Sequence, residues 1–159
     1  MSSLPSLGPR GEGWVVIQFI LLFAIFAAGL VEPPLAGPAW TVVAAAGVAV
    51  TLAGGLLAVL GVLHLGRSLT PLPHPRDGAE LVEDGVYRVV RHPIYGGLVI
   101  GSLGYGLVMR APLAGMVGAL ALLGFFRLKS AREEAWLEHR YSGYPAYRAR
   151  TRRMLPFLY

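Results

Sequence analysis

The chain has 159 residues, of which 55% are hydrophobic and 14% charged, and its formal net charge is +5. So apolar a composition excludes an ordinary soluble domain, and the positive charge does not indicate nucleic-acid binding, because the basic residues lie beside apolar segments and not on a soluble basic face. The sequence has no cysteine, which excludes disulfides, thiolate nucleophiles and cysteine-based metal sites, and we predict no metal site of another kind.

Two long apolar segments occupy the first half of the chain. Residues 14–31 are interrupted only by the polar Gln18 and are just long enough, at about 1.5 Å of rise per residue, to cross a hydrocarbon core of about 30 Å. A cleaved signal peptide is the alternative interpretation, since an Ala-Ala-Gly sequence supplies small residues, but the apolar run is long and its flank barely basic. Residues 40–65 form the second predicted span, with glycines that permit close helix contact.

A polar segment, residues 66–91, follows the second span. Three prolines within five residues, Pro71, Pro73 and Pro75, force an extended path there. We interpret the segment as a linker at the membrane surface. His64, just before it, is predicted to be an interfacial histidine that hydrogen-bonds to the backbone, with a substrate contact as the alternative.

Two shorter apolar segments, residues 94–109 and 113–126, are predicted to form a helical hairpin, because only a tight turn separates them. Gly97 and Gly101 can seat the first of these against a neighbouring helix. The sequence thus predicts an all-α polytopic membrane protein of one domain, residues 1–159, with about four transmembrane helices and a cytoplasmic C-terminal helix.

The C-terminal region is highly charged and begins with a helix that emerges from the fourth span. Lys129 and Glu133 are four residues apart in it and therefore share one helical face. Pro145 is predicted to end or kink this helix. Four arginines near the end can attract anionic membrane lipid: Arg148, Arg150, Arg152 and Arg153.

The basic residues also predict the orientation. With four spans, the N-terminus, the polar segment and the C-terminal region share one side of the membrane, and they hold every Lys and Arg except Arg110. By the positive-inside rule that side is the cytoplasm. We therefore expect an integral protein of the cytoplasmic or inner membrane with both termini cytoplasmic.

Residues 85–97 concentrate charged and aromatic side chains between two apolar segments. Pro93 disfavours helix at His92 and suits the first position of a new helix, whose free N–H groups face back toward Arg91. Such a helix start can bind an anion, and the ring of Tyr95 can receive a cation. These features indicate a polar ligand site at the membrane surface.

This stretch and the charged helix together resemble a known family. The similarity lies in the pattern Leu81-Val82-x-x-Gly85-x-Tyr87-Arg88-x-x-Arg91-His92-Pro93-x-Tyr95-x-Gly97, followed by Lys129-x-x-x-Glu133-Glu134-x-x-Leu137. The pattern is similar to that of the isoprenylcysteine carboxyl methyltransferase and phospholipid methyltransferase family of membrane enzymes. The resemblance covers about residues 65–156, the expected catalytic core.

The resemblance implies an S-adenosylmethionine-dependent methyltransferase acting on a lipophilic or prenylated acceptor, most like protein-S-isoprenylcysteine carboxyl O-methyltransferase. The implied cofactor-binding residues are Tyr87, His92, Pro93, Tyr95, Gly96, Glu133, Glu134, Tyr144 and Tyr147. The implied catalytic residues are Lys129, Glu133 and Arg91, with Lys129 at a position that is often arginine and faces the acceptor. The family often has Phe-Gly before its paired tyrosines, whereas the run Tyr141-Ser142-Gly143-Tyr144 is one residue tighter.

Other functions stay open at this point. Phospholipid amine N-methylation and small-thiol S-methylation would use the same arrangement, and a sterol-type NADPH reductase has a related C-terminal part. A non-catalytic scaffold or transporter subunit is the alternative from another class, although a transporter should place ionisable groups within its spans. A carboxylate acceptor needs no general base, whereas an amine or thiol must lose a proton.

Overall fold

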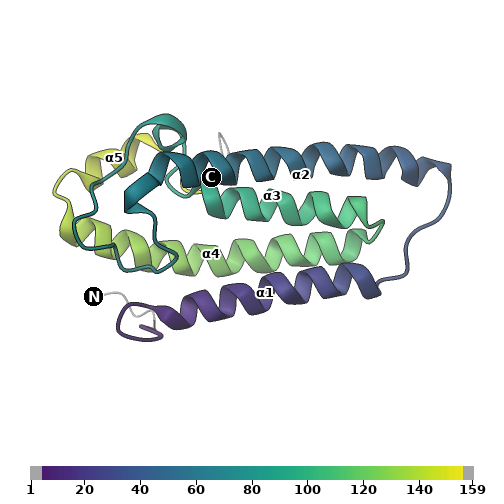
Figure 1. The fold of residues 1–159 in the computed structure, drawn as a ribbon, viewed down its shortest axis with the longest axis horizontal. Helices are drawn as coiled ribbons and strands as arrows, with labels where there is room; N and C mark the ends of the chain where they lie inside the picture. Colours follow the sequence, from purple (N-terminus) through teal and green to yellow (C-terminus); the bar gives the residue numbers. More distant parts are fainter. Residues whose placement is uncertain (1–4, 156–159) are drawn as a thin grey trace.

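Four long helices run side by side in the computed structural model of the protein, which describes residues 5–155 (Figure 1). They are α1 (Glu12–Val31), α2 (Pro38–Leu65), α3 (Pro93–Val108) and α4 (Pro112–Arg140). The short helices η1 (Gly66–Ser68) and η2 (Gly85–Arg88) lie between α2 and α3, and α5 (Tyr144–Arg150) follows α4. The predicted all-α fold is confirmed. Pro156, the last residue of the expected catalytic core, lies outside the described residues.

Three of the helices, α1, α2 and α4, are long and apolar enough to cross a membrane, and α3 is a shorter apolar helix. The protein is therefore an integral membrane protein. The helix of the predicted fourth span does not end at residue 126 but continues to Arg140, because the charged segment holds good helix formers without Gly or Pro. The break falls at Tyr141, before Pro145, which instead lies in the first turn of α5.

Glycines bring α2 and α3 into direct backbone contact. A methyl group at Gly54 would lie 2.6 Å from the backbone nitrogen of Gly101 and 2.6 Å from the carbonyl oxygen of Gly97. The expected role of the Gly97 and Gly101 pair in helix packing is confirmed. Close packing here fixes the start of α3, which carries part of the charged end of the bundle.

The helices α3 and α4 form the predicted hairpin. The N–H of Ala111 donates to the carbonyl of Gly106 at 2.8 Å, and a methyl group on Gly106 would lie 2.4 Å from the Cα of Gly115. At the same end of the bundle the carboxylate of Glu32 accepts hydrogen bonds from the N–H groups of Leu113 (3.3 Å) and Ala114 (2.7 Å). The loop after α1 thus caps the first turn of α4.

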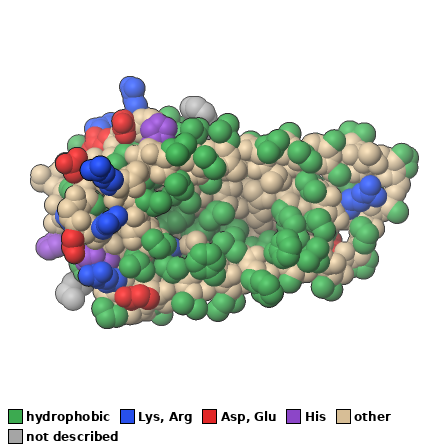
Figure 2. Space-filling view, viewed as in Figure 1, with side chains coloured by type: hydrophobic (Ala, Val, Ile, Leu, Met, Phe, Trp, Pro, Cys, Tyr) green, Lys and Arg blue, Asp and Glu red, His purple; other side chains and the backbone are tan. Residues whose placement is uncertain are grey.

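Charged side chains gather at the other end of the bundle, where α5 and the loops lie, and apolar side chains cover most of the visible remainder (Figures 1 and 2). His64, at the end of α2, has its Nδ1 2.7 Å from the carbonyl oxygen of Leu60, which confirms its predicted backbone hydrogen bond. Gly85 lies against this ring with φ +54°, and a methyl group there would lie 2.0 Å from the His64 ring. Only glycine fits that turn.

Candidate active site

A cavity of about 270 Å³ lies at the charged end of the bundle. Its walls come from α1, the end of α2, the polar segment after it, the turn before α3, the charged half of α4, and α5. All the residues that the sequence predicted for the site line this cavity except Gly96 and Glu134. The fold therefore brings together residues that are far apart in the chain, such as Tyr147 and Tyr87, which are 60 positions apart.

The turn at His92 is held by the C-terminal segment, which runs beside it. The backbone N–H groups of Arg91 and His92 donate to the carbonyls of Arg152 and Arg153, each at 2.8 Å. Gly96 belongs to this contact, because a methyl group there would lie 2.1 Å from the carbonyl oxygen of Met154. The structure thus places Gly96 against the C-terminal segment and not in the cavity wall.

Aromatic stacking orients the side chains that follow this turn. The ring of Tyr95 stacks on Phe126 of α4, with centroids 4.4 Å apart and planes 5° apart. The Tyr95 hydroxyl donates to Oε2 of Glu133 at 2.9 Å, and Nδ1 of His92 lies 3.7 Å from the same oxygen. Glu133 therefore presents a carboxylate to the cavity in a fixed position.

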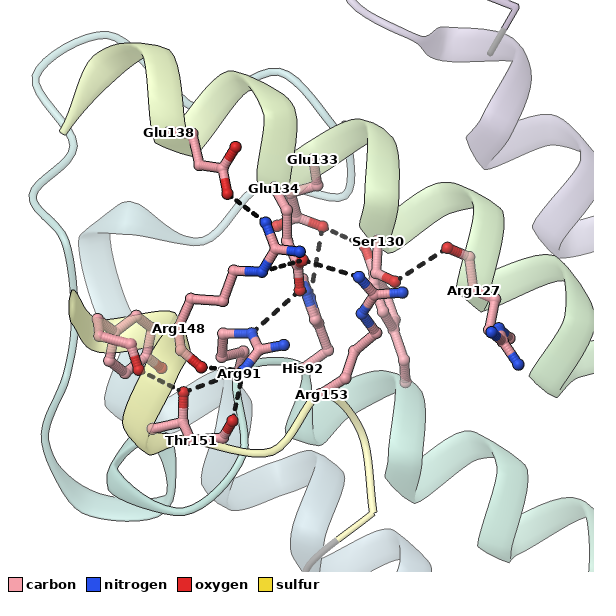
Figure 3. A network of polar contacts seen from close by, with 12 residues as sticks. Arg91, His92, Arg127, Ser130, Glu133, Glu134, Glu138, Arg148, Thr151 and Arg153 are labelled. Carbon is pink, nitrogen blue, oxygen red and sulfur yellow. Dashed lines mark hydrogen bonds and ion pairs between the residues drawn. The ribbon is translucent and has the colours of Figure 1, made fainter. Parts of the chain in front are cut away.

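Glu134 lies behind the cavity wall at the centre of a charged network (Figure 3). It is 2% exposed, and its carboxylate accepts hydrogen bonds from Arg91 Nε (3.1 Å), His92 Nε2 (3.1 Å) and Arg153 Nη2 (3.0 Å). The Nε of Arg148 lies 3.9 Å from it. A buried carboxylate surrounded by cations and donors holds these side chains in place, so Glu134 acts on the cavity through its partners.

Arg91 joins this network to the segment after α5. Its Nη1 donates to the carbonyls of Arg148 (3.0 Å) and Thr151 (2.5 Å) and lies 3.2 Å from the Thr151 hydroxyl. Although Arg91 lines the cavity, these polar contacts are structural. These hydrogen bonds hold α5 beside the cavity.

Lys129 is buried in the opposite wall, with 1% of its surface exposed. Its ammonium donates to Oε1 of Gln18 at 2.7 Å and to the carbonyl oxygen of Pro71 at 2.9 Å. It also lies 5.2 Å from the centre of the Tyr95 ring. Lys129 thus connects α4 to α1 and to the proline-rich segment.

Three buried tyrosines complete the enclosure. The hydroxyl of Tyr147 donates to the carbonyl of Tyr87 at 2.9 Å, and that of Tyr87 donates to the carbonyl of Gly61 at 3.2 Å. The hydroxyl of Tyr144 is buried and has no hydrogen-bond partner among residues 5–155. Burial raises the pKa of all three well above the usual range of tyrosine, so they remain neutral hydrogen-bond donors.

Sequence reasoning missed two kinds of participant. Gln18 lines the cavity, and the one feature of the sequence that could have indicated this is that it is a polar residue within an apolar segment. The terminal arginines were expected to attract lipid, yet Arg153 binds Glu134, and Arg150 and Arg148 pair with Glu83 and Glu138. Their counter-charges lie far away in the sequence, so only the fold reveals them.

Comparison with known proteins identifies the family. The sequence model described as phospholipid methyltransferase matches residues 42–143, which include the turn at His92 and the charged half of α4. The chain belongs to the phospholipid methyltransferase family. The matched residues include most of the cavity wall but neither α1 nor α5.

Named relatives of this phospholipid methyltransferase family member are similar over part of their length. The chain is 31% identical over 115 residues to a probable protein-S-isoprenylcysteine O-methyltransferase of Oryza sativa subsp. indica, covering 70% of this chain and 60% of the relative. It is 31% identical over 121 residues to protein-S-isoprenylcysteine O-methyltransferase of Rattus norvegicus, covering 74% of this chain and 43% of the relative. The chain therefore spans 60% or less of the length of these relatives.

A solved structure shares the fold. The structure of the eukaryotic intramembrane Ras methyltransferase, isoprenylcysteine carboxyl methyltransferase, superposes with a TM-score of 0.64 at 20% sequence identity. The match covers 96% of this chain and 55% of that one. At this identity the likeness concerns the arrangement of the helices, which here includes α1.

Proposed function

We propose that the protein is an S-adenosylmethionine-dependent methyltransferase that esterifies the carboxylate of a lipophilic acceptor, as in protein-S-isoprenylcysteine carboxyl O-methylation. One observation carries this proposal: the same cavity is lined by Glu133, by the buried Lys129 and by Tyr144, whose hydroxyl has no hydrogen-bond partner among residues 5–155. The names of the curated relatives support the same reaction.

The cavity residues fit the proposed cofactor. Glu133 can accept hydrogen bonds from ribose hydroxyls or an amino group, and the buried Tyr144 hydroxyl needs an acceptor that residues 5–155 do not supply. The N-terminus of α3, at Pro93, adds partial positive charge for a carboxylate. When bound, S-adenosylmethionine would supply an electrophilic methyl group on a sulfonium.

The side chains then serve to position and enclose the reactants. Lys129 would hold the acceptor carboxylate, which is already a nucleophile and needs no general base. The neutral tyrosines and the segment tied down by Arg91 would exclude water from the cavity. Methyl transfer between two fixed groups would gain its rate mainly from this orientation.

The membrane placement is part of the proposal. The charged end of the bundle, with the cavity, would face the cytoplasm, because basic residues other than Arg110 concentrate there. Both termini would lie on that side. A water-soluble cofactor could then enter from the cytoplasm, and the acceptor's lipid chain could remain in the bilayer.

Ligand titration tests the proposal directly. Protein purified in detergent is titrated with S-adenosylmethionine and, separately, with NADPH, and methyl transfer is assayed with an N-acetylated S-farnesylated cysteine as acceptor. We expect saturable binding of S-adenosylmethionine, none of NADPH, and formation of the methyl ester. Binding of NADPH alone would overturn the proposal in favour of a reductase, and binding of neither would favour a non-catalytic protein.

Methylation of a phospholipid is the second candidate, because the family description names phospholipids, and we take the amine of the head group as the acceptor in that case. An amine acceptor is protonated at neutral pH and would be repelled by the Lys129 ammonium. The carboxylate acceptor is therefore preferred. Phosphatidylethanolamine in the same assay gives the comparison, and its methylation in place of the farnesylated cysteine would reverse the preference.

A further inference from the structure

The Lys129 ammonium is buried and makes no direct ion pair with a carboxylate of residues 5–155, although the Glu133 carboxylate acts on it electrostatically from farther away. Within residues 5–155 no Asp or Glu oxygen lies within 4 Å of its nitrogen, and its hydrogen bonds go to the neutral oxygens of Gln18 and Pro71. The nearby Glu133 carboxylate is held instead by Tyr95. A buried charge is costly unless an opposite charge compensates it, so this wall of the cavity is prepared for an anion.

Gln18 orients this cation without neutralising it. Its amide oxygen accepts from Lys129 at 2.7 Å, while its amide nitrogen makes no hydrogen bond with residues 5–155. Because Gln18 also lines the cavity, its amide group and the Lys129 ammonium lie side by side in one wall, and the amide N–H groups are hydrogen-bond donors. A glutamate at this position would form an ion pair with Lys129, so that its carboxylate would take the place of an anionic ligand.

We propose that Gln18 of α1 is a specificity-determining residue that, with Lys129, selects a carboxylate as the methyl acceptor. This inference rests on the proposed function and deepens it. Gln18 lies outside residues 42–143, so the family pattern does not include it. The helix α1 therefore contributes to substrate choice as well as to the membrane anchor.

Binding of an acid and of its ester separates this role from a structural one. The probes are an N-acetylated S-farnesylated cysteine and its methyl ester, which lacks the anionic charge. Dissociation constants for both are measured with the wild type, Gln18→Glu and Gln18→Leu. Phe23→Leu is the matched control on α1, because Phe23 is 72% exposed on the outside of the bundle.

We expect Gln18→Glu to weaken binding of the acid at least tenfold and binding of the ester less than twofold, since only the acid needs the free charge of Lys129. Gln18→Leu should weaken acid binding by a smaller factor, because the cation remains. S-Adenosylmethionine affinity should change less than twofold in both variants. Phe23→Leu should match the wild type in every measurement.

Two results would overturn the inference. The first is a Gln18→Glu protein that binds the acid as tightly as the wild type. The second is equal weakening of acid and ester, which would indicate a structural role alone. Failure of the proposed function would give a different result, because the wild type would then bind the acid selectively yet transfer no methyl group. The ratio of the dissociation constants of acid and ester in each variant would still test the role of Gln18.

Discussion

The ring of His92 stacks on the ring of Tyr95, with centroids 5.3 Å apart and planes 6° apart. Both residues also contact consecutive carboxylates on α4: the His92 ring hydrogen-bonds to Glu134 and lies 3.7 Å from Glu133, and the Tyr95 hydroxyl donates to Glu133. Glu133 faces the cavity and Glu134 faces the charged network behind it. The stacked pair therefore couples the ligand-facing wall to the segment that supports it.

Removing either ring should weaken cofactor binding. For His92→Ala and Tyr95→Ala we expect a loss of about 1 to 3 kcal/mol in S-adenosylmethionine binding, because a buried polar group loses its partner in each. Tyr95→Phe keeps the stack and removes only the hydrogen bond to Glu133, so its loss should be smaller. Isothermal titration in detergent measures these affinities, and unchanged affinity in both alanine variants would refute the placement of the cofactor.

Neutralising Glu134 should destabilise the protein. In Glu134→Gln the buried network keeps its arginines but loses their common counter-charge, for an expected cost of about 3 kcal/mol. The matched control is Glu138→Gln, whose carboxylate is 38% exposed and pairs with Arg148. Thermal unfolding in detergent compares the two variants, and equal midpoints would show that the network does not stabilise the fold.

The effect of Lys129→Met should report the acceptor class. With a carboxylate acceptor this variant should raise KM or lower kcat while S-adenosylmethionine affinity stays nearly constant, because only the acceptor loses a contact. Lys129→Arg should retain much of the activity, since the charge survives. With an amine acceptor Lys129→Met should be neutral or activating, and a loss of cofactor affinity alone would place Lys129 on the wrong side of the cavity.

Two adjacent glycines of α2 offer a matched test of helix packing. Gly54→Ala forces a methyl group to within 2.6 Å of the α3 backbone, whereas at Gly55 no atom lies within 4 Å of the added carbon. We expect Gly54→Ala to destabilise by about 1 to 3 kcal/mol and Gly55→Ala to be neutral or slightly stabilising. The midpoints of thermal unfolding of the two variants measure this difference, and equal stability would contradict the close contact of α2 and α3.

Reporter fusions test the orientation. A reporter after Tyr159 should be cytoplasmic, and one inserted at Gly37, in the loop between α1 and α2, should lie on the opposite side. Proteolytic accessibility of each fusion in intact cells and in lysed cells gives the readout. Reporters on the same side would show that α1 or α2 does not cross the membrane.

Much of this architecture could be predicted from the sequence because its signals are local. The apolar runs predicted the long helices, and Pro93 predicted the start of α3. The Gly97 and Gly101 pair predicted close contact with a neighbouring helix, which the structure shows to be α2. A charged helix that emerges from the fourth span was also predicted, and it is the second half of α4, which ends at Arg140 and not at Pro145.

The missed parts depend on partners that are distant in sequence. Nothing near Arg153 indicates that it binds Glu134, and nothing near Gln18 indicates that it binds Lys129. The different positions of Glu133, in the cavity wall, and Glu134, buried behind it, could not be predicted either, because the sequence does not show which way each of two adjacent glutamates points.

The capping of α4 by Glu32 has a consequence for the depth of the site in the bilayer. At about 1.5 Å of rise per residue, Lys129 lies about 26 Å along the axis from Pro112, close to the hydrocarbon thickness of about 30 Å. Since α4 is one uninterrupted helix, the distance between its capped N-terminus and Lys129 is fixed. A thicker or thinner bilayer would then raise or lower the whole cavity relative to the lipid head groups, and under the proposed function the membrane thickness would influence which acceptors reach it.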